Sequence, residues 1–424
     1  MKSNRKVLIG AAIFVALYFS ILMLIQYGKL LPSVKKIDGI EKQGKTFQEL
    51  NIPEDVKVVG IGEASHGNAE FQTAKLMMLK KLVETGKCHS IAFEMSPGEA
   101  GEINDAIHSE DSDIIEQMSR SDYPLYDTQQ MIDLVTWMKE YNKGKSVEES
   151  LMFYGVDSQG GIRDMEYLRS FGEKHEGIIS DEEAALLDKA INGDNEDVEG
   201  FKSFVNDLIQ RCNEKDEYEF KYAAGVAQVL LQNIDAPNFD EDKVKGSEYR
   251  DNAMAENVKR FYDLEVERGY SQILITAHNG HSMKGLQDGY EVPSMGQRVY
   301  DIFEGSYYSV GTAYYNACVN IHVAGTFDDE YQREDYNFCS DDILAYQAQF
   351  FDGGFYCLNF DEITDKDSEL YKRIHKPGLM GLVGEGYSED WAMNRMDRVK
   401  LVQGDIFDAV LYYYNVTPIR VLDY

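Results

Sequence analysis

The 424-residue sequence contains little cysteine, little proline and comparatively little positive charge. Its five cysteines are widely scattered, form no CxxC pair, and are odd in number, which excludes complete intramolecular disulfide pairing. There are 42 lysines and arginines against 74 aspartates and glutamates, which gives a net charge of −32. A surface this acidic repels phosphates and anionic lipid headgroups, so nucleic acid is not an expected partner.

The sequence also lacks several motifs that would identify a catalytic class. No G-x-S-x-G sequence is present, so Ser65 is not predicted to be a hydrolase nucleophile. There is no H-E-x-x-H zinc motif, no Walker loop and no G-x-G-x-x-G after a strand. We therefore predict that the protein uses no nucleotide, and we expect no cofactor.

The N-terminus contains an uncharged apolar run, Val7–Ile25, which follows three basic residues. The run is about as long as a helix that crosses a bilayer, and no Ala-x-Ala cleavage site follows it. We predict that residues 1–27 form an uncleaved signal anchor, a single transmembrane helix, with the folded body outside the cytoplasm and residues 28–50 as a polar connector. A cleaved signal peptide and the opposite orientation remain alternatives, because three lysines beyond the run nearly balance the basic residues before it.

In residues 51–424, short apolar runs alternate with helical patterns, which is typical of parallel βαβ units. We therefore predict an α/β fold with a largely parallel sheet flanked by helices. The predicted strands are 56–61, 90–93, 151–156, 273–276, 307–310, 355–360 and 409–414, and the predicted helices are 69–85, 181–191, 201–232 and 248–268. Residues 160–270 are too long for a simple crossover, so we expect a helical insertion or cap there.

Two of the predicted strands end in turns rich in histidine. Glu63 and His66 follow the first strand, and the second of these turns contains His278, Asn279 and His281. Ligands of open α/β sheets bind beyond the carboxyl ends of the strands. We therefore expect these side chains, which are more than 200 residues apart in the sequence, to form one composite site.

Two further carboxylates, Glu94 and Asp157, follow the strands at 90–93 and 151–156. A histidine held by a carboxylate can act as a general base and deprotonate water. Each residue alone has a structural alternative, since a single histidine is often structural and both acids could be helix N-caps. The same side chains could also ligate zinc or manganese, but H-x-x-H is a weak signal and no metal is predicted.

These motifs occur in a characteristic order along the chain. They are Gly62–Gly67, Ala92-Phe93-Glu94, Tyr154-Gly155-Val156-Asp157, the segment from Arg250 to Asn257, Ala277–His281, and Phe407-Asp408-Ala409 leading to Thr417-Pro418. Together they resemble the erythromycin esterase family over most of residues 40–424.

The resemblance implies an α/β core with a helical portion that forms a cleft, and hydrolysis of a macrolide lactone without a serine nucleophile. The proposed water-activating histidine of that family corresponds to His66. The two glutamates of its motifs correspond to Glu63 and Glu94, and its H-N-G-H histidines to His278 and His281. These are five of the positions selected above from the residues themselves.

The chain departs from the family pattern in two respects. Some members carry an arginine twelve residues after the first glutamate, where this chain has Lys75, and lysine cannot form the same planar, bidentate contact. The predicted anchor also suggests an envelope substrate or a different ester. We expect Lys75, Asp157 and Asn279 to contact the substrate.

The sequence thus predicts a hydrolase of a small-molecule ester or macrolide-type lactone, which touches the membrane only through its N-terminal helix. One alternative is a metal-dependent hydrolase of an envelope phosphate ester or polysaccharide substituent. Another is a non-catalytic envelope binding protein with the same cleft.

Overall fold

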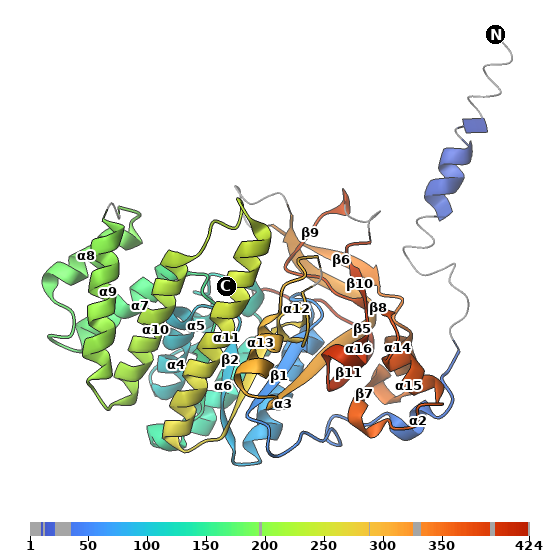
Figure 1. Ribbon diagram of the computed structural model, residues 1–424, viewed down its shortest axis with the longest axis horizontal. Coiled ribbons are helices and arrows are strands. Elements are labelled where there is room, and N and C mark those ends of the chain that lie inside the picture. Colours follow the sequence, from blue (N-terminus) through green and yellow to red (C-terminus); the bar gives the residue numbers. More distant parts are fainter. Residues whose placement is uncertain are drawn as a thin grey trace, which may run out of the picture.

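A mixed sheet forms the centre of the molecule (Figure 1). The computed structural model describes residues 10–11, 13–21, 35–194, 197–287, 289–324, 332–390 and 395–422. Within these residues the sheet has nine strands, with the main order β3-β2-β4-β1-β5-β11-β7, and β6 and β9 also pair with β5. The pairs that join β3, β2, β4, β1, β5 and β11 are all parallel, whereas β7 and β6 are antiparallel to their neighbours. The largely parallel α/β sheet predicted from the sequence is confirmed.

The strands of this sheet are β1 (Val58–Glu63), β2 (Cys88–Phe93), β3 (Met152–Gly155), β4 (Gln272–His278), β5 (Tyr307–Val323), β6 (Arg333–Cys339), β7 (Phe355–Asn359), β9 (Gly386–Tyr387) and β11 (Ala409–Val416). A separate two-stranded sheet contains β8 (Gly378–Gly381) and β10 (Arg398–Leu401). Strand β5 is much longer than the predicted 307–310, and β6 was not predicted. Three of the seven residues of β6 are polar and exposed, so it carries no apolar run.

The described helices are α2 (Ile40–Gln43), α3 (Ala69–Val83), α4 (Pro97–His108), α5 (Ile114–Met118), α6 (Gln129–Asn142), α7 (Gly161–Lys174), α8 (Asp181–Ile191), α9 (Val198–Asn213), α10 (Tyr218–Asp235), α11 (Lys243–Arg268), α12 (Asn279–Ser282), α13 (Met295–Ile302), α14 (Ile343–Gln347), α15 (Glu369–Ile374) and α16 (Gln403–Ile406). Several begin at side-chain caps. Ser180 and Glu183, for example, form a reciprocal capping box at the start of α8.

Alternate residues of each central strand pack into different hydrophobic clusters on the two faces of the sheet. Tyr154 and Ile273 belong to the cluster that includes α7, α9, α10 and α11. Phe153 and Leu274 belong to the cluster that includes α3, α4 and α6. Burial on both faces explains why these strands are continuous apolar runs in the sequence.

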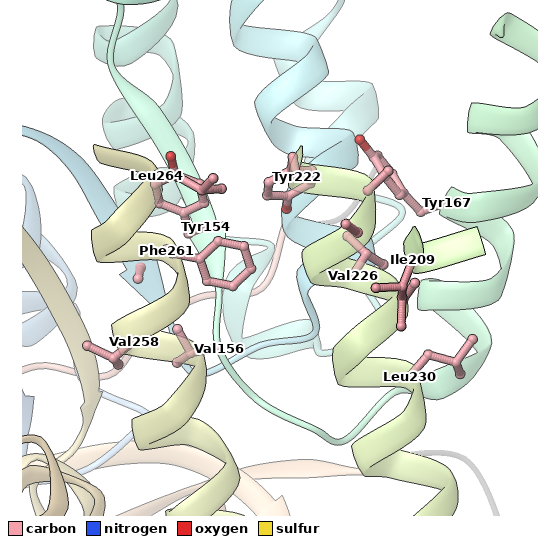
Figure 2. Packing of buried hydrophobic residues seen from close by; sticks show 14 of the residues in the cluster. Tyr154, Val156, Tyr167, Ile209, Tyr222, Val226, Leu230, Val258, Phe261 and Leu264 are labelled. Carbon is pink, nitrogen blue, oxygen red and sulfur yellow. The ribbon is translucent and has the colours of Figure 1, made fainter. Parts of the chain in front are cut away.

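Helices α7–α11 occupy the segment between β3 and β4, where we expected the insertion or cap. Figure 1 shows α7–α10 grouped at one end of the molecule. Figure 2 shows side chains of the hydrophobic cluster that they share with α11, in which Phe261 of α11 lies beside Tyr154 of β3. The single helix predicted over 201–232 is wrong, since α9 and α10 are separate. Residues 214–217 are all charged, and the break lets the apolar faces of the two helices pack against each other.

The described residues include no helix that is both long and apolar enough to cross a membrane. Of the transmembrane helix predicted over residues 1–27, the structure describes only residues 10–11 and 13–21, which are helical. The remainder of that prediction lies outside the described residues. The described residues therefore do not support that prediction. From residue 35 onward the predicted connector is not simply polar, because Ile37, Ile40, Phe47 and Leu50 are buried in the core.

Candidate active site

The carboxyl ends of four adjacent parallel strands bring the predicted polar residues together. The strands lie in the order β3, β2, β4 and β1. At or just after their carboxyl ends are, in the same order, Asp157, Glu94, His278 and Glu63. Strand register aligns them, since Glu63 lies opposite His278 and Phe93, the residue before Glu94, lies opposite Thr276. The crevice expected beyond the strand ends is therefore where these side chains meet.

His66 lies in the turn after β1 and is held by Glu63. Its Nδ1 is 2.8 Å from Glu63 Oε1, and Glu63 Oε2 is 2.9 Å from the Lys75 Nζ of α3. All three residues are more than nine-tenths buried. Burial alone would raise the pKa of Glu63, but the Lys75 ammonium and the hydrogen bond with His66 lower it to about 2. Glu63 is therefore an ionised acceptor that fixes the orientation of the His66 ring.

The same contacts set the proton affinity of His66. Burial lowers the pKa of an imidazole, but the hydrogen bond with Glu63 and the charges of Glu63 and Glu94 together raise the His66 pKa above its ordinary value. With Nδ1–H donated to Glu63, Nε2 is the ring nitrogen that can accept a proton. His66 thus has the hydrogen-bonding pattern of a general base.

Arg250, from α11, joins the remaining polar residues. Its Nε and Nη2 donate to the two carboxylate oxygens of Asp157 at 3.0 and 2.6 Å, and Nη2 also donates to Glu94 Oε1 at 2.8 Å. Nη1 lies 3.1 Å from Nε2 of His281. Burial would raise the pKa of Glu94, but His281 and Arg250 hold it well below its usual range. Arg250 therefore bridges two buried carboxylates, Glu94 and Asp157.

His281 forms a second pair with a buried carboxylate. Its Nδ1 lies 2.7 Å from Oδ1 of Asp251, whose other oxygen accepts the backbone N–H of Met295 at 2.6 Å. Burial opposes the charged imidazole, but Asp251 and Glu94 raise the pKa of His281 above its ordinary value. Asp251 therefore fixes the orientation of the His281 ring beside Glu94.

His278 differs from the other two histidines. Its backbone N–H donates to Glu94 Oε2 at 2.8 Å, and its Nδ1 accepts the backbone N–H of Gly280 at 3.3 Å. Burial, together with the nearby His66 whose ring centroid is 5.1 Å away, lowers the His278 pKa to about 3. A neutral ring with an accepting Nδ1 carries its proton on Nε2. This N–H has no hydrogen-bond partner within the described part of the chain.

Two cavities meet at these side chains. The first, which we call the strand-end cavity, has a volume of about 310 Å³ and is lined by His66, Glu94, Tyr123, Leu125, Tyr126, Asp157, Gln159, Arg250, His278, His281, Gly384 and Glu385. The second, the adjoining cavity, has a volume of about 380 Å³ and shares Gln159, Arg250, His278, His281 and Gly384 with the first. Volumes in this range are typical of small-molecule sites.

Lys75 and Asn279, which we expected to contact a substrate, do not line either cavity. Lys75 is only 2% exposed and pairs with Glu63. Asn279 is 1% exposed and donates to the backbone oxygen of Thr312 on β5 at 2.8 Å. A Cβ on Gly62 would collide with Asn279, so this glycine lets α12 pack closely against β1. The structure places both residues in supporting positions.

The sequence-based prediction did not include Arg250 and Asp251 among the site residues. Both lie within the segment that contributed to the family resemblance, but they are in the interior of helix α11. The prediction selected polar residues that follow strands, so it did not select them. Tyr123, Tyr126, Gln159 and Glu385 also line the strand-end cavity without having been predicted. They lie on loops and a short helical turn. Hydrophobic periodicity predicts helices and strands but not the positions of such segments.

The described residues contain no group of three or more histidines, cysteines, aspartates or glutamates that could hold a metal ion. The strand-end carboxylates are instead paired with protein cations, Glu63 with Lys75, and Glu94 and Asp157 with Arg250. A metal ion would have to displace these cations. The contacts therefore disfavour the metal-dependent alternative.

Removing the charge of Lys75 should be costly. In a Lys75→Met variant, Glu63 would remain buried without its counter-ion, and breaking a buried pair in this way typically lowers the free energy of unfolding by about 3–5 kcal/mol. Urea denaturation should measure this loss. Adding Glu63→Gln should recover part of the stability, because no unpaired charge remains. A loss below about 1 kcal/mol, the range of surface pairs, would contradict the buried pairing.

The fold and the site together define a class of protein, an α/β protein with a buried histidine–carboxylate centre at the carboxyl edge of its sheet. Residues 83–416 match the erythromycin esterase family, and the chain belongs to that family. It is therefore an esterase. An erythromycin esterase type II of Escherichia coli is 25% identical over 304 residues, which cover 62% of this chain and 70% of that protein.

Solved structures share the fold. A Bacillus cereus protein aligns with a TM-score of 0.69 at 18% identity, covering 91% of this chain and 98% of its own. A protein described as a succinoglycan biosynthesis protein gives 0.68 at 16% identity, with 90% and 97% covered. A mutant of the erythromycin esterase EreC in its open conformation gives 0.59 at 17% identity, with 88% and 93% covered.

Proposed function

We propose that this protein hydrolyses a carboxylic ester or macrolide-type lactone with water activated by His66, without a serine nucleophile. The observation that carries the proposal is the hydrogen bond between His66 Nδ1 and the ion-paired Glu63, which leaves Nε2 as the accepting nitrogen beside the strand-end cavity. A base held in one tautomer by a carboxylate typically contributes about 10²–10⁴-fold to rate.

In the first step, His66 Nε2 removes a proton from a water molecule while the water oxygen bonds to the carbonyl carbon of the ester. The carbonyl oxygen becomes an oxyanion. The unpaired Nε2–H of His278 is a suitable donor to this oxygen, since a donor that is already fixed in place needs no reorganisation. Arg250 adds positive charge in the same cavity.

In the second step, the oxyanion collapses and the bond from the carbonyl carbon to the alkoxide oxygen breaks. The proton on His66 Nε2 transfers to the leaving alkoxide, which departs as an alcohol. One water is consumed, and its atoms are divided between the acid and the alcohol. His66 returns to its neutral form, and Glu63 stays ionised throughout.

The surroundings of Ser65 support the part of the proposal that omits a serine nucleophile. Ser65 is fully buried, and its Oγ donates to Oδ1 of Asn68 at 2.5 Å. It lines neither cavity. A nucleophilic serine would instead need its Oγ beside both a base and the substrate carbonyl.

The substrate class is proposed from the names of the relatives, two of which are erythromycin esterases. A screen of generic esters, simple lactones and macrolides with the full chain tests it. We expect cleavage of at least one ester or lactone by the parent and retention of that activity in a Ser65→Ala variant. Absence of cleavage of every ester and lactone would overturn the proposed function.

The pKa of His66 predicts the direction of the pH dependence. Only the neutral imidazole can accept a proton from water, and the His66 pKa is raised above the ordinary value of 6.5. The kcat/KM should therefore rise with pH, with a midpoint above that value, and fall as acid protonates His66. Initial rates measured from pH 5 to 9 test this. A profile that falls with rising pH over the same range would assign the essential group a different role.

We also propose, from the sequence alone, that the catalytic body lies outside the cytoplasm behind a single-pass N-terminal anchor. The proposal rests on the uncharged run Val7–Ile25 and the basic residues before it. Alkaline phosphatase fused after Tyr424 should be active if the body is exported. Fluorescence from a reporter that matures only in the cytoplasm would reverse the orientation.

A further inference from the structure

A third cavity lies apart from the two that meet at the strand-end histidines and shares no lining residue with them. Its volume is about 540 Å³, which is larger than that of either. Its walls come from α14, α15, β8, β10 and α16, and Figure 1 shows α14, α15 and β8 at the end of the molecule opposite α8 and α9. We call it the basic pocket, because four cationic side chains line it, Lys372, Arg373, Lys376 and Lys400.

The carboxylates that line the basic pocket already have partners. Asp341 pairs with two arginines of the segment 395–398. Asp342 is buried, and it accepts hydrogen bonds from Nε2 of Gln403 at 2.9 Å and from backbone N–H groups at the start of α14. Glu369 is exposed and pairs with the one arginine that lines the pocket. The three lysines are therefore not neutralised by these acids, and the pocket is positively charged.

Two of the lysines come from separate segments and have no acidic partner. Lys376 follows α15 and Lys400 belongs to β10. Neither ammonium group forms a hydrogen bond or an ion pair with any residue that the structure describes. Lys372 donates only to the backbone oxygen of Asp367, at 2.6 Å. Ammonium groups that share a cavity repel one another, and a bound anion replaces this repulsion with charge-assisted hydrogen bonds.

The charge of the basic pocket is opposite to that of the chain, whose net charge is −32. An acidic surface repels anions, so a local positive cavity is where an anion is attracted. A single small ion would fill only a small part of 540 Å³. A ligand with several anionic groups can instead contact cations from both segments at once. Lysine and arginine are the usual protein partners of phosphate oxygens.

The two-stranded sheet fixes one wall of the basic pocket and separates it from the adjoining cavity. Strands β8 and β10 pair in antiparallel register, with Leu379 opposite Lys400, and both of these residues line the basic pocket. Val399, the preceding residue of β10, lines the adjoining cavity instead. Successive residues of a strand point to opposite faces, so the pocket and the adjoining cavity lie on opposite faces of this sheet.

We infer that the basic pocket is a second binding site, which takes an anionic ligand carrying two or more phosphate groups. Lys376 and Lys400 donate to different phosphate groups, and Lys372 adds a donor from α15. Leu379 contacts the less polar part of the ligand. A soluble phosphate compound and a membrane surface of phosphate headgroups both have this chemistry. The site is independent of the proposed ester hydrolysis.

Calorimetric titration of pyrophosphate into the full chain tests the site, with Lys376→Gln and Lys400→Gln as variants. Both lysines are exposed, so these substitutions should leave the fold intact. Lys143→Gln is the matched control, because it removes the same charge from a side chain that is 69% exposed and does not line the pocket. A second arm measures sedimentation of the same proteins with phosphatidylglycerol or phosphatidylcholine vesicles. All of them carry the same N-terminal run, so its contribution to vesicle binding is shared.

We expect the Kd for pyrophosphate to rise by about tenfold or more with Lys376→Gln and with Lys400→Gln, and to remain unchanged with Lys143→Gln. Preference for phosphatidylglycerol that both pocket variants remove, without pyrophosphate binding, would support the site and assign its ligand to a lipid headgroup. Binding of neither probe would overturn the inference. Binding that the pocket variants leave unchanged, or that Lys143→Gln weakens equally, would also overturn it.

Discussion

Replacing His66 with glutamine is expected to lower kcat by about 10²–10⁴-fold on any ester that the parent cleaves. Glutamine has a similar reach but cannot accept a proton from water at neutral pH. The fold should persist, because His66 lies in a turn at the edge of the cavity rather than in the hydrophobic core. Steady-state rates, with circular dichroism to confirm folding, provide the measurement.

His375 supplies the control for this substitution. It is exposed, stacks on Tyr371 and lies outside both cavities, so His375→Gln should leave kcat unchanged. Wild-type turnover by the His66→Gln protein would remove His66 from the mechanism. A similar loss in both variants would mean that the effect comes from general destabilisation and not from the base.

Replacing Arg250 with methionine is expected to lower both stability and activity. The guanidinium is the shared partner of Glu94 and Asp157, whose side chains are only 8% and 5% exposed. Removing it leaves Glu94 and Asp157 without the guanidinium that pairs with both, which should lower the free energy of unfolding by about 3–5 kcal/mol at neutral pH. The strand-end cavity also loses the positive charge of the guanidinium, and His281 loses its contact with Arg250.

The pH dependence of this loss has a definite sign. In the parent, the pKa of Glu94 is held below its usual range, so its pairing stabilises the folded protein above the ordinary carboxyl pKa and is lost as acid protonates the group. The stability difference between parent and Arg250→Met should therefore be largest near neutral pH and narrow in acid. Urea denaturation at several pH values measures it.

An arginine with exposed partners provides the comparison. Arg169 pairs with Glu173 and Asp188, whose side chains are 64% and 53% exposed. Surface ion pairs of this kind contribute about 0–1 kcal/mol, so Arg169→Met should change stability little. If Arg250→Met were no more destabilising than Arg169→Met, the buried network around Arg250 would not be a source of stability.

Strands buried on both faces were the part of the fold that the sequence identified best. Val58–Ile61 of β1 and Ile273–Ile275 of β4 are continuous apolar runs, and their buried positions explain why. The polar strand β6 pairs near the surface with the C-terminal half of β5, so neither segment is a continuous apolar run in the sequence. The break between α9 and α10 depends on packing between the two helices, which local periodicity does not record.

The site was predictable to the extent that it depends on strand ends. Glu63, His66, Glu94, Asp157, His278 and His281 all follow or end buried strands, and parallel topology brings them together without further information. Arg250 and Asp251 enter from a helix, and only the tertiary fold turns that face of α11 toward the cavity. Lys75 lies close to the first motif and Asn279 lies within the second, but Lys75 pairs with Glu63 and Asn279 bonds to Thr312, so neither lines a cavity.

The central claim is that Glu63 orients the His66 ring and raises its pKa. The pH profile of a Glu63→Gln variant tests this claim most directly. Without the carboxylate, and with the Lys75 ammonium still nearby, the protonated form of His66 is no longer stabilised and the His66 pKa falls. The account predicts that kcat/KM falls and that the midpoint of its pH profile moves to lower pH than in the parent. A Glu63→Gln protein with the parent's rate and an unmoved midpoint would contradict the account.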